Sequence, residues 1–397
     1  MVYEQNLIPI LNIVFLSVLI FSSLLRVRNL NFIFPLFLIV VLSELLLSGN
    51  TMFHLTDWPD YRSMKLEQFV PTSYFSGDRA FWELMLVVNN SEISGFATHL
   101  SFKVLMISIF IFALKKIQIS KSSIYFSSIL WFSSLGFSMA SEWYLRQGIA
   151  FHLLLLFMFL ITYSSIYNFK KNDLSFIYET YKKARYLLVT IVIALTHFGT
   201  FFHCLIFIFG NYLRVFWNEL IFSSSKKDTV NSRFDIFLFG LFIFILFFVI
   251  FGFIKFANLD IYISNRMNGF KDTKFPYSAI LVFVILYLNY ESIRSNFIKL
   301  KNGNYLDSLS IRKIYSHLNL IKIFIFFQAV GVAVYFSYPY LLRINNFKDA
   351  YIAVSAGILF NFVEKYYKRS QGSISWIEIS MFINIAYLIF LLVVRLI

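Results

Sequence analysis

The sequence contains little cysteine and little charge. Its 397 residues include a single cysteine, Cys204, within an apolar run, so neither a disulfide framework nor a cysteine zinc site is available. Charged residues make up 14% of the chain, whereas ordinary soluble proteins have about 25%. The GxSxG, P-loop, HExxH and CxxC motifs are all absent. Their absence excludes the usual patterns of hydrolases, nucleotide-binding proteins and zinc proteases.

Apolar residues are abundant instead. They make up 59% of the chain, and the mean hydropathy is +0.71. Long apolar runs recur, such as Ile236 to Ile254, and a membrane span needs about 20 residues of this kind. We therefore expect an all-α polytopic integral membrane protein with about twelve transmembrane helices, forming one domain over residues 1–397. The net charge of +14 comes from short clusters between apolar runs, so we expect no nucleic-acid partner.

The expected spans follow the apolar runs and the basic clusters between them. They lie near 7–25, 31–48, 95–114, 122–140, 148–167, 186–198, 200–217, 235–256, 276–292, 317–338, 349–364 and 375–396. We predict that 186–217 is a hairpin of two short helices, because one long helix would put three later basic clusters outside, against the positive-inside bias. Both termini then lie outside. Glu4 before the first run, with Arg26 and Arg28 after it, predicts that this helix is retained.

The hairpin puts five basic clusters on the cytoplasmic side. They are Lys115/Lys116/Lys121, Lys170/Lys171/Lys182/Lys183/Arg185, Lys226/Lys227/Arg233, Arg294/Lys299/Lys301/Arg312/Lys313 and Lys365/Lys368/Arg369. The outer side then has loops near 49–94, 141–147, 257–275 and 339–348. The first loop is the longest, and its apolar stretch 80–88 is too short to span, so we expect it to lie in the interface or to re-enter the bundle.

The polar residues that stand out all fall on the outer side. Charges at membrane depth are costly unless they are paired or line a water-filled cavity, so we expect the outer loops to converge on one cavity. The residues are Asp57, Asp60, Tyr61, Asp78, Arg79, Glu83, Glu142, Arg146, Gln147, His197, His203, Arg266, Lys271, Lys274 and Arg343.

Three of these signals have two interpretations each. Arg146 falls in the first turn of a predicted helix and can donate to an anion there, or it is an interfacial arginine beside aromatic residues. His197 ends a short half-helix, where it serves either as a base or as a packing residue. His197 and His203 together do not make a zinc site, because a third ligand is missing. Asp57 and Asp60 supply a general base, or they are solvated or capping groups.

The order of these positions resembles the Wzy-type O-antigen polymerases and the EpsG-type exopolysaccharide polymerases. The resemblance covers most of the chain, and its best-marked motif is an Arg-Gln that opens a helix followed by small residues. The matching segments are Asp57–Tyr61, Asp78–Leu84, Arg146–Ala150, Ile191–His197 and Arg343–Phe347. The chain departs from the family at Ala80, where Gly is usual, at Phe347, where Tyr is common, and at the added charge of Arg79.

The resemblance implies a polysaccharide polymerase of lipopolysaccharide or exopolysaccharide biosynthesis, a glycosyltransferase with a fold similar to GT-C-like polymerases. It would move a growing glycan from an undecaprenyl-pyrophosphate carrier to a lipid-linked repeat unit at the outer leaflet of the bacterial inner membrane. No cofactor or metal is expected, and membrane lipid and a chain-length regulator are candidate partners. Catalytic roles would fall to Arg146, His197, Asp60 and Asp78, and substrate binding to Arg343, Arg266, Gln147, Tyr61 and Glu142.

Two other classes remain open at this stage. A flippase or other transporter of the same lipid-linked oligosaccharide would also have about a dozen helices and basic cavities, but the sequence shows no repeat symmetry. A membrane O-acyltransferase would need a catalytic histidine, and neither His152 nor His317 lies in a supporting motif.

Overall fold

The computed structural model describes seven main stretches of the chain, all helical or connecting helices. They are 95–132, 134–138, 140–141, 145–167, 277–337, 347–367 and 375–396, together with residues 81, 87, 188, 191–193 and 196. Within these residues all the regular structure is helical, as the all-α prediction requires. The helices are α5 (Gly95–Lys116), α6 (Lys121–Phe132), α7 (Leu135–Ser138), α8 (Leu145–Tyr167), α13 (Tyr277–Asn302), α14 (Ser308–Ser337), α15 (Lys348–Tyr366) and α16 (Trp376–Leu396).

Four predicted helices are confirmed closely and three need correction. Segments 95–114, 148–167, 349–364 and 375–396 correspond to α5, α8, α15 and α16. The predicted helix 276–292 continues to Asn302 in α13, and the predicted helix 317–338 begins at Ser308 in α14. The charged residues there are good helix formers, and Arg294 pairs with Glu291 at 2.8 Å one turn away, so helix continues beyond the apolar run. The predicted spans 7–25, 31–48, 200–217 and 235–256 lie outside the described residues.

The third correction is a break in the predicted helix 122–140, which forms α6 and the short α7. Ser134 causes the break: its Oγ donates to the carbonyl oxygen of Trp131 at 2.7 Å and accepts from the backbone N–H of Phe137 at 3.1 Å. A serine hydroxyl that accepts from the third residue of a helix is an N-cap. Ser134 therefore ends one helix and begins the next.

Side-chain caps also fix the starts of the last helices. Asp307 accepts the backbone N–H of Ser310 at 3.1 Å, before α14. Ser375 and Glu378 form a capping box before α16, because the Glu378 carboxylate accepts the Ser375 N–H at 2.9 Å and the Ser375 hydroxyl accepts the Glu378 N–H at 3.4 Å.

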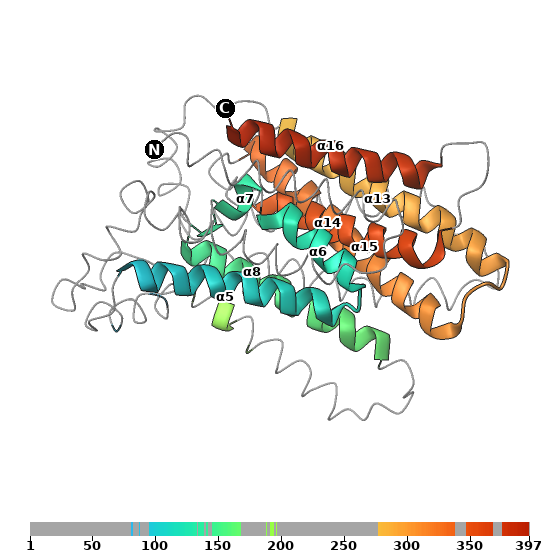
Figure 1. The fold of residues 1–397 in the computed structure, drawn as a ribbon, viewed down its shortest axis with the longest axis horizontal. Coiled ribbons are helices and arrows are strands. Elements are labelled where there is room, and N and C mark those ends of the chain that lie inside the picture. Colours follow the sequence, from blue (N-terminus) through green and yellow to red (C-terminus); the bar gives the residue numbers. More distant parts are fainter. Residues whose placement is uncertain are drawn as a thin grey trace.

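Helix α15 lies at the centre of the described bundle. It packs against α6, α7, α13, α14 and α16, and its residues from Asp349 to Leu359 are all buried. Small residues allow this close packing. A Cβ on Gly357 would collide with the hydroxyl of Ser127 on α6, which donates to the carbonyl oxygen of Ala353 at 2.6 Å. Figure 1 shows the helices side by side along the long axis of the molecule.

The two ends of this bundle differ in which helices begin there and in which charged residues they carry. At one end, here named the site end, α8 and α15 begin and α7 lies beside them (Figure 1). At the other, the basic end, α5 and α15 stop while α6 and α14 start. His317 donates from Nε2 to the carbonyl oxygen of Ile117 at 2.7 Å, and Asn361 accepts the backbone N–H of Ser120 at 2.9 Å. These contacts join the segments that carry Lys115, Arg312 and Lys365, so three predicted basic clusters do lie together.

In the stretches that the structure describes, no helix is both long enough and apolar enough to be assigned as a membrane span. Phe81, from the apolar stretch 80–88, is buried and packs against Phe102 of α5, with ring centroids 6.3 Å apart.

Candidate functional site at the start of α8 and α15

Arg146 and Gln147 lie in the first turn of α8, where the sequence predicted them. The helix begins at Leu145, so the first backbone N–H groups of α8 have no partner within the helix and give this end a partial positive charge. Arg146 is half-buried and Gln147 is buried. A guanidinium beside a helix N-terminus is a favourable position for an anion.

Gly148 holds this turn against the preceding segment. A Cβ at this position would overlap the carbonyl oxygen of Ala140, so only glycine lets the two backbones approach so closely. The small residue after Arg-Gln therefore has a structural reason, since it fixes how α8 starts relative to the chain that leaves α7.

His152 links α8 to α6 one turn below Gly148. Its Nδ1 donates to the Gly148 carbonyl oxygen at 2.7 Å, so Nε2 accepts the indole N–H of Trp131 at 3.1 Å. Both side chains are fully buried. The imidazole uses both nitrogens for packing partners, and rings surround it, including Phe110, Phe137 and Phe151. His152 therefore fixes the geometry of the site end and is not available as a nucleophile or base.

The second predicted motif, Arg343–Phe347, ends beside the first. Phe347 precedes α15, and its ring stacks on that of Phe151 of α8, with centroids 4.6 Å apart. Phe151 lies five residues after Arg146, so Arg146 is about 7 Å further toward the site end along the axis of α8. Lys348, directly after Phe347, is partly buried.

Asp349 ties α15 to both α7 and α16. Its buried carboxylate accepts the hydroxyl of Tyr387 at 2.8 Å and the backbone N–H of Gly136 at 3.2 Å. A buried carboxylate is stable only when such donors satisfy it. Asp349 thereby holds the start of α15 in place, next to the start of α8.

The arrangement favours binding of an anion and its stabilisation as charge develops. Two helix N-termini, those of α8 and α15, lie at the same end. The guanidinium of Arg146 lies at the start of α8, whereas at the start of α15 the carboxylate of Asp349 offsets the ammonium of Lys348, so the anion is expected at the start of α8. Such preorganised donors are the means by which proteins stabilise a leaving phosphate or pyrophosphate. Within the described residues, no three His, Cys, Asp or Glu side chains lie together as a metal site.

The other predicted site residues lie outside the described stretches, so only Arg146 and Gln147 can be placed. Those outside are Asp60, Tyr61, Asp78, Glu142, His197, Arg266 and Arg343. The residue before His197, Thr196, is helical and donates to the Val192 carbonyl oxygen at 2.9 Å, as a helix in 186–198 requires.

Sequence reasoning did not find Asp349, Tyr387 or Trp131. Asp349 lies at a predicted helix start, where an acidic residue is expected for capping alone. The partners of Asp349 are far away in sequence, 213 residues for Gly136 and 38 for Tyr387. His152 was considered only as a catalytic histidine of an acyltransferase, and its contact with Trp131 was not predicted.

Comparison of the chain with protein-family models, with curated proteins and with solved structures gives no match.

Proposed function

We propose that this chain is a membrane-embedded polysaccharide polymerase of the O-antigen type. It would transfer a growing glycan from an undecaprenyl-pyrophosphate carrier to a lipid-linked repeat unit. In this proposal the chain is a multi-pass protein of the bacterial inner membrane and its site end faces the periplasm. Sequence order, charge distribution and the residues at the site end support the proposal together.

The observation that carries the proposal is the stacking of Phe151 on Phe347. Phe151 follows the first arginine-containing segment and Phe347 ends the second, almost 200 positions later in the chain. Positive groups near a pyrophosphate would stabilise it as a leaving group, and this contact brings Phe347, the last residue of the second segment, beside the helix that begins with Arg146. The N-terminus of α8 adds to the positive potential there.

The proposed reaction is a displacement at the anomeric carbon. The acceptor hydroxyl of the new repeat unit attacks the anomeric carbon of the growing glycan, and the bond from that carbon to the pyrophosphate oxygen breaks. The pyrophosphate leaves with the bonding electron pair, and the arginines stabilise its charge through bidentate hydrogen bonds. The proton of the hydroxyl goes to a base, for which His197, Asp60 and Asp78 are the candidates.

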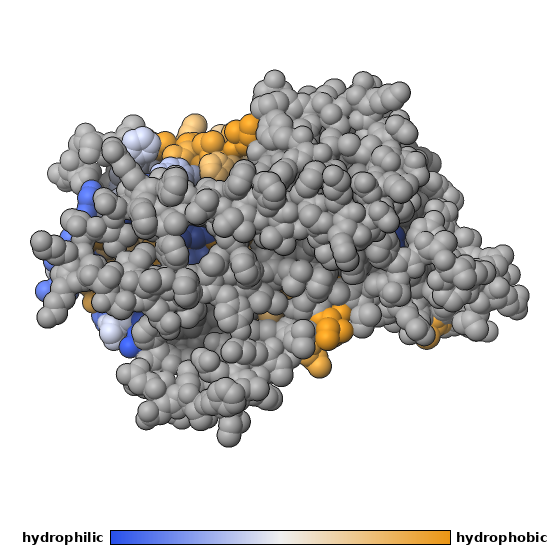
Figure 2. All heavy atoms as spheres, turned by 180° about the vertical axis from the view of Figure 1, so that it is seen from behind, coloured by the Kyte–Doolittle hydropathy of each residue, from blue (hydrophilic) through white to orange (hydrophobic). Residues whose placement is uncertain are grey.

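Exposed apolar side chains support a membrane location. Large hydrophobic residues are exposed along α5, α13 and α16, including Phe112, Val284 and Phe382, which is 71% exposed. Figure 2 shows hydrophobic side chains at the edge where α16 lies in Figure 1. Patches of this kind mark a surface that contacts lipid or another apolar partner.

The test is elongation in vitro. The purified full-length protein, in detergent or proteoliposomes, is given a lipid-linked repeat unit alone, and the product is separated by size. A ladder of longer lipid-linked glycans supports the proposal. Movement of the repeat unit across the bilayer without elongation would instead support the flippase alternative and overturn the polymerase.

A further inference from the structure

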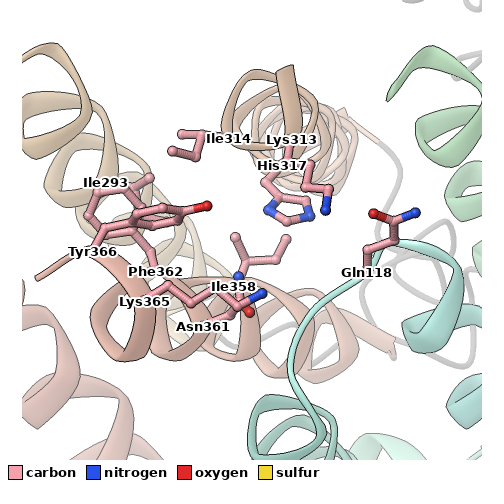
Figure 3. Close-up of a pocket in the computed structure, with 10 residues that line it drawn as sticks. All are labelled: Gln118, Ile293, Lys313, Ile314, His317, Ile358, Asn361, Phe362, Lys365 and Tyr366. Atoms are coloured by element: carbon pink, nitrogen blue, oxygen red, sulfur yellow. The ribbon is translucent and has the colours of Figure 1, made fainter. Parts of the chain in front are cut away.

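A small pocket lies at the basic end, opposite the site end. Helix α14 contributes Lys313 and His317, α15 contributes Asn361 and Lys365, and Gln118 comes from the α5–α6 turn. Figure 3 shows these side chains around a common space, with Tyr366 on its far side. The enclosed cavity is about 10 Å³, which is room for a single water-sized atom. A ligand can therefore place one oxygen atom inside it, while the rest of the ligand lies at the opening.

Two buried polar side chains form a fixed floor for the pocket. His317 donates from Nε2 to the Ile117 carbonyl oxygen at 2.7 Å, and Asn361 accepts the Ser120 N–H through Oδ1 at 2.9 Å. The backbone donor determines which Asn361 atom is oxygen, so the amide Nδ2 is the remaining group. Among the described residues, no acceptor receives a hydrogen bond from that Nδ2.

The lining carries positive charge without a carboxylate of its own. Lys313 and Lys365 both line the pocket, and its described lining residues include no Asp or Glu. Burial lowers the pKa of Lys365, and the nearby positive charge of Lys313 lowers it further. The adjacent Glu364 partly offsets this, but its carboxylate accepts the Ser120 hydroxyl at 2.5 Å and lies outside the lining. Two like charges held close to each other are stabilised when an anion binds between them.

We propose that this pocket binds a phosphate group, with Lys313 and Lys365 as its counter-charges and the Asn361 amide as a hydrogen-bond donor. The group belongs to an anionic lipid headgroup or to free phosphate. Basic pockets between helices at the cytoplasmic side of a membrane protein are suited to such headgroups. The inference does not depend on the proposed glycan transfer, because it concerns the opposite end of the bundle.

The test uses purified full-length protein in detergent. Retention of phosphatidylglycerol is measured by native mass spectrometry for the wild type and for a double variant, Lys313→Gln with Lys365→Gln. Each of the two lysines is expected to strengthen binding about fivefold, so we expect the double variant to bind about thirtyfold more weakly. Inorganic phosphate at millimolar concentration is then added as a competitor. Displacement of the lipid identifies free phosphate as a ligand, and its failure identifies the lipid headgroup.

The matched control is Lys299→Gln with Lys301→Gln. It removes the same charge from the exposed last turn of α13, outside the pocket, and should retain the lipid as the wild type does. Asn361→Asp is a second variant, since it keeps the acceptor for Ser120 while replacing the donor with a negative charge; it should bind still less. Equal losses in the two double variants, or no retention of lipid or phosphate by the wild type, would overturn the proposal.

Discussion

Phe347 and Phe151 stack with their ring planes 26° apart, which places the start of α15 against the first turns of α8. Both helices begin at the same end, so their positive N-termini reinforce each other instead of cancelling. The contact itself is one of aromatic packing, because it joins two phenylalanine rings. It gives the start of α8, which carries Arg146, a packed support.

Arg146 gives the most direct test of the proposed function. Lysine keeps the positive charge of Arg146 but loses the planar fork that binds two phosphate oxygens. Removal of a preorganised donor to a developing anion typically costs about 10²-fold in rate, so Arg146→Lys should elongate glycans about 10²-fold more slowly. The measurement is elongation of a lipid-linked repeat unit. The expression level and melting temperature of the variant are measured as well, and both should equal those of the wild type.

The control for Arg146 is Arg294→Lys. Arg294 lies toward the basic end on α13 and pairs with Glu291 on the half-exposed surface, so its replacement should leave elongation unchanged. Normal long polymer from Arg146→Lys would return Arg146 to the role of an interfacial anchor.

His197 separates a role in chemistry from a role in packing. If its imidazole takes the acceptor proton, His197→Gln should fold normally and lose about 10² or more in rate. A packing role predicts that His197→Gln is nearly silent and that His197→Ala melts earlier. Polymer length and melting temperature are measured together, with His203→Gln as the control that should keep normal length. An active His197→Gln protein would leave Asp60 and Asp78 as the candidate bases.

Gly148→Ala tests the close approach of α8 to the segment before it. The added methyl group would meet backbone, which cannot move aside, so the variant should lose about 1–3 kcal/mol of stability. Thermal melting of the detergent-solubilised protein measures the loss. Gly303→Ala is the matched control: its methyl would meet only the Tyr305 ring, 78% exposed and able to rotate away, so it should change stability by less than about 0.5 kcal/mol. Equal melting of the two variants would contradict the packing argument.

A buried asparagine pair between α13 and α16 predicts that the effects of replacing its two members on stability are not independent. Asn289 and Asn384 exchange hydrogen bonds of 3.2 and 2.7 Å, both fully buried. Asn289→Leu leaves Asn384 without its partner and should cost about 1–3 kcal/mol. The double replacement by leucine should cost less than the sum of the two single losses, as measured by melting. Strict additivity would show that the two amides do not depend on each other.

The sequence predicted the helices more fully than their contacts. Apolar runs located α5, α8, α15 and α16 because the length of such a run sets the length of a helix. They could not show that α13 continues to Asn302, since lysine and arginine extend a helix without adding to its hydropathy. Ser134 splits a predicted helix through hydrogen bonds that no periodicity reveals. Arg146 was placed correctly from local order alone, whereas Asp349 needs partners that only the folded chain brings together.

The asparagine pair also bears on the order in which the chain is assembled during synthesis. Helix α13 leaves the ribosome well before α16, so the side chain of Asn289 is made before its partner Asn384. Ser355 of α15 is made between them, and its hydroxyl accepts a hydrogen bond from the Asn289 amide at 2.9 Å. Helix α16 therefore completes the hydrogen bonding of a segment made about 95 residues earlier. We expect a nascent chain without α16 to expose the amide of Asn289 and to be a target for quality-control proteolysis.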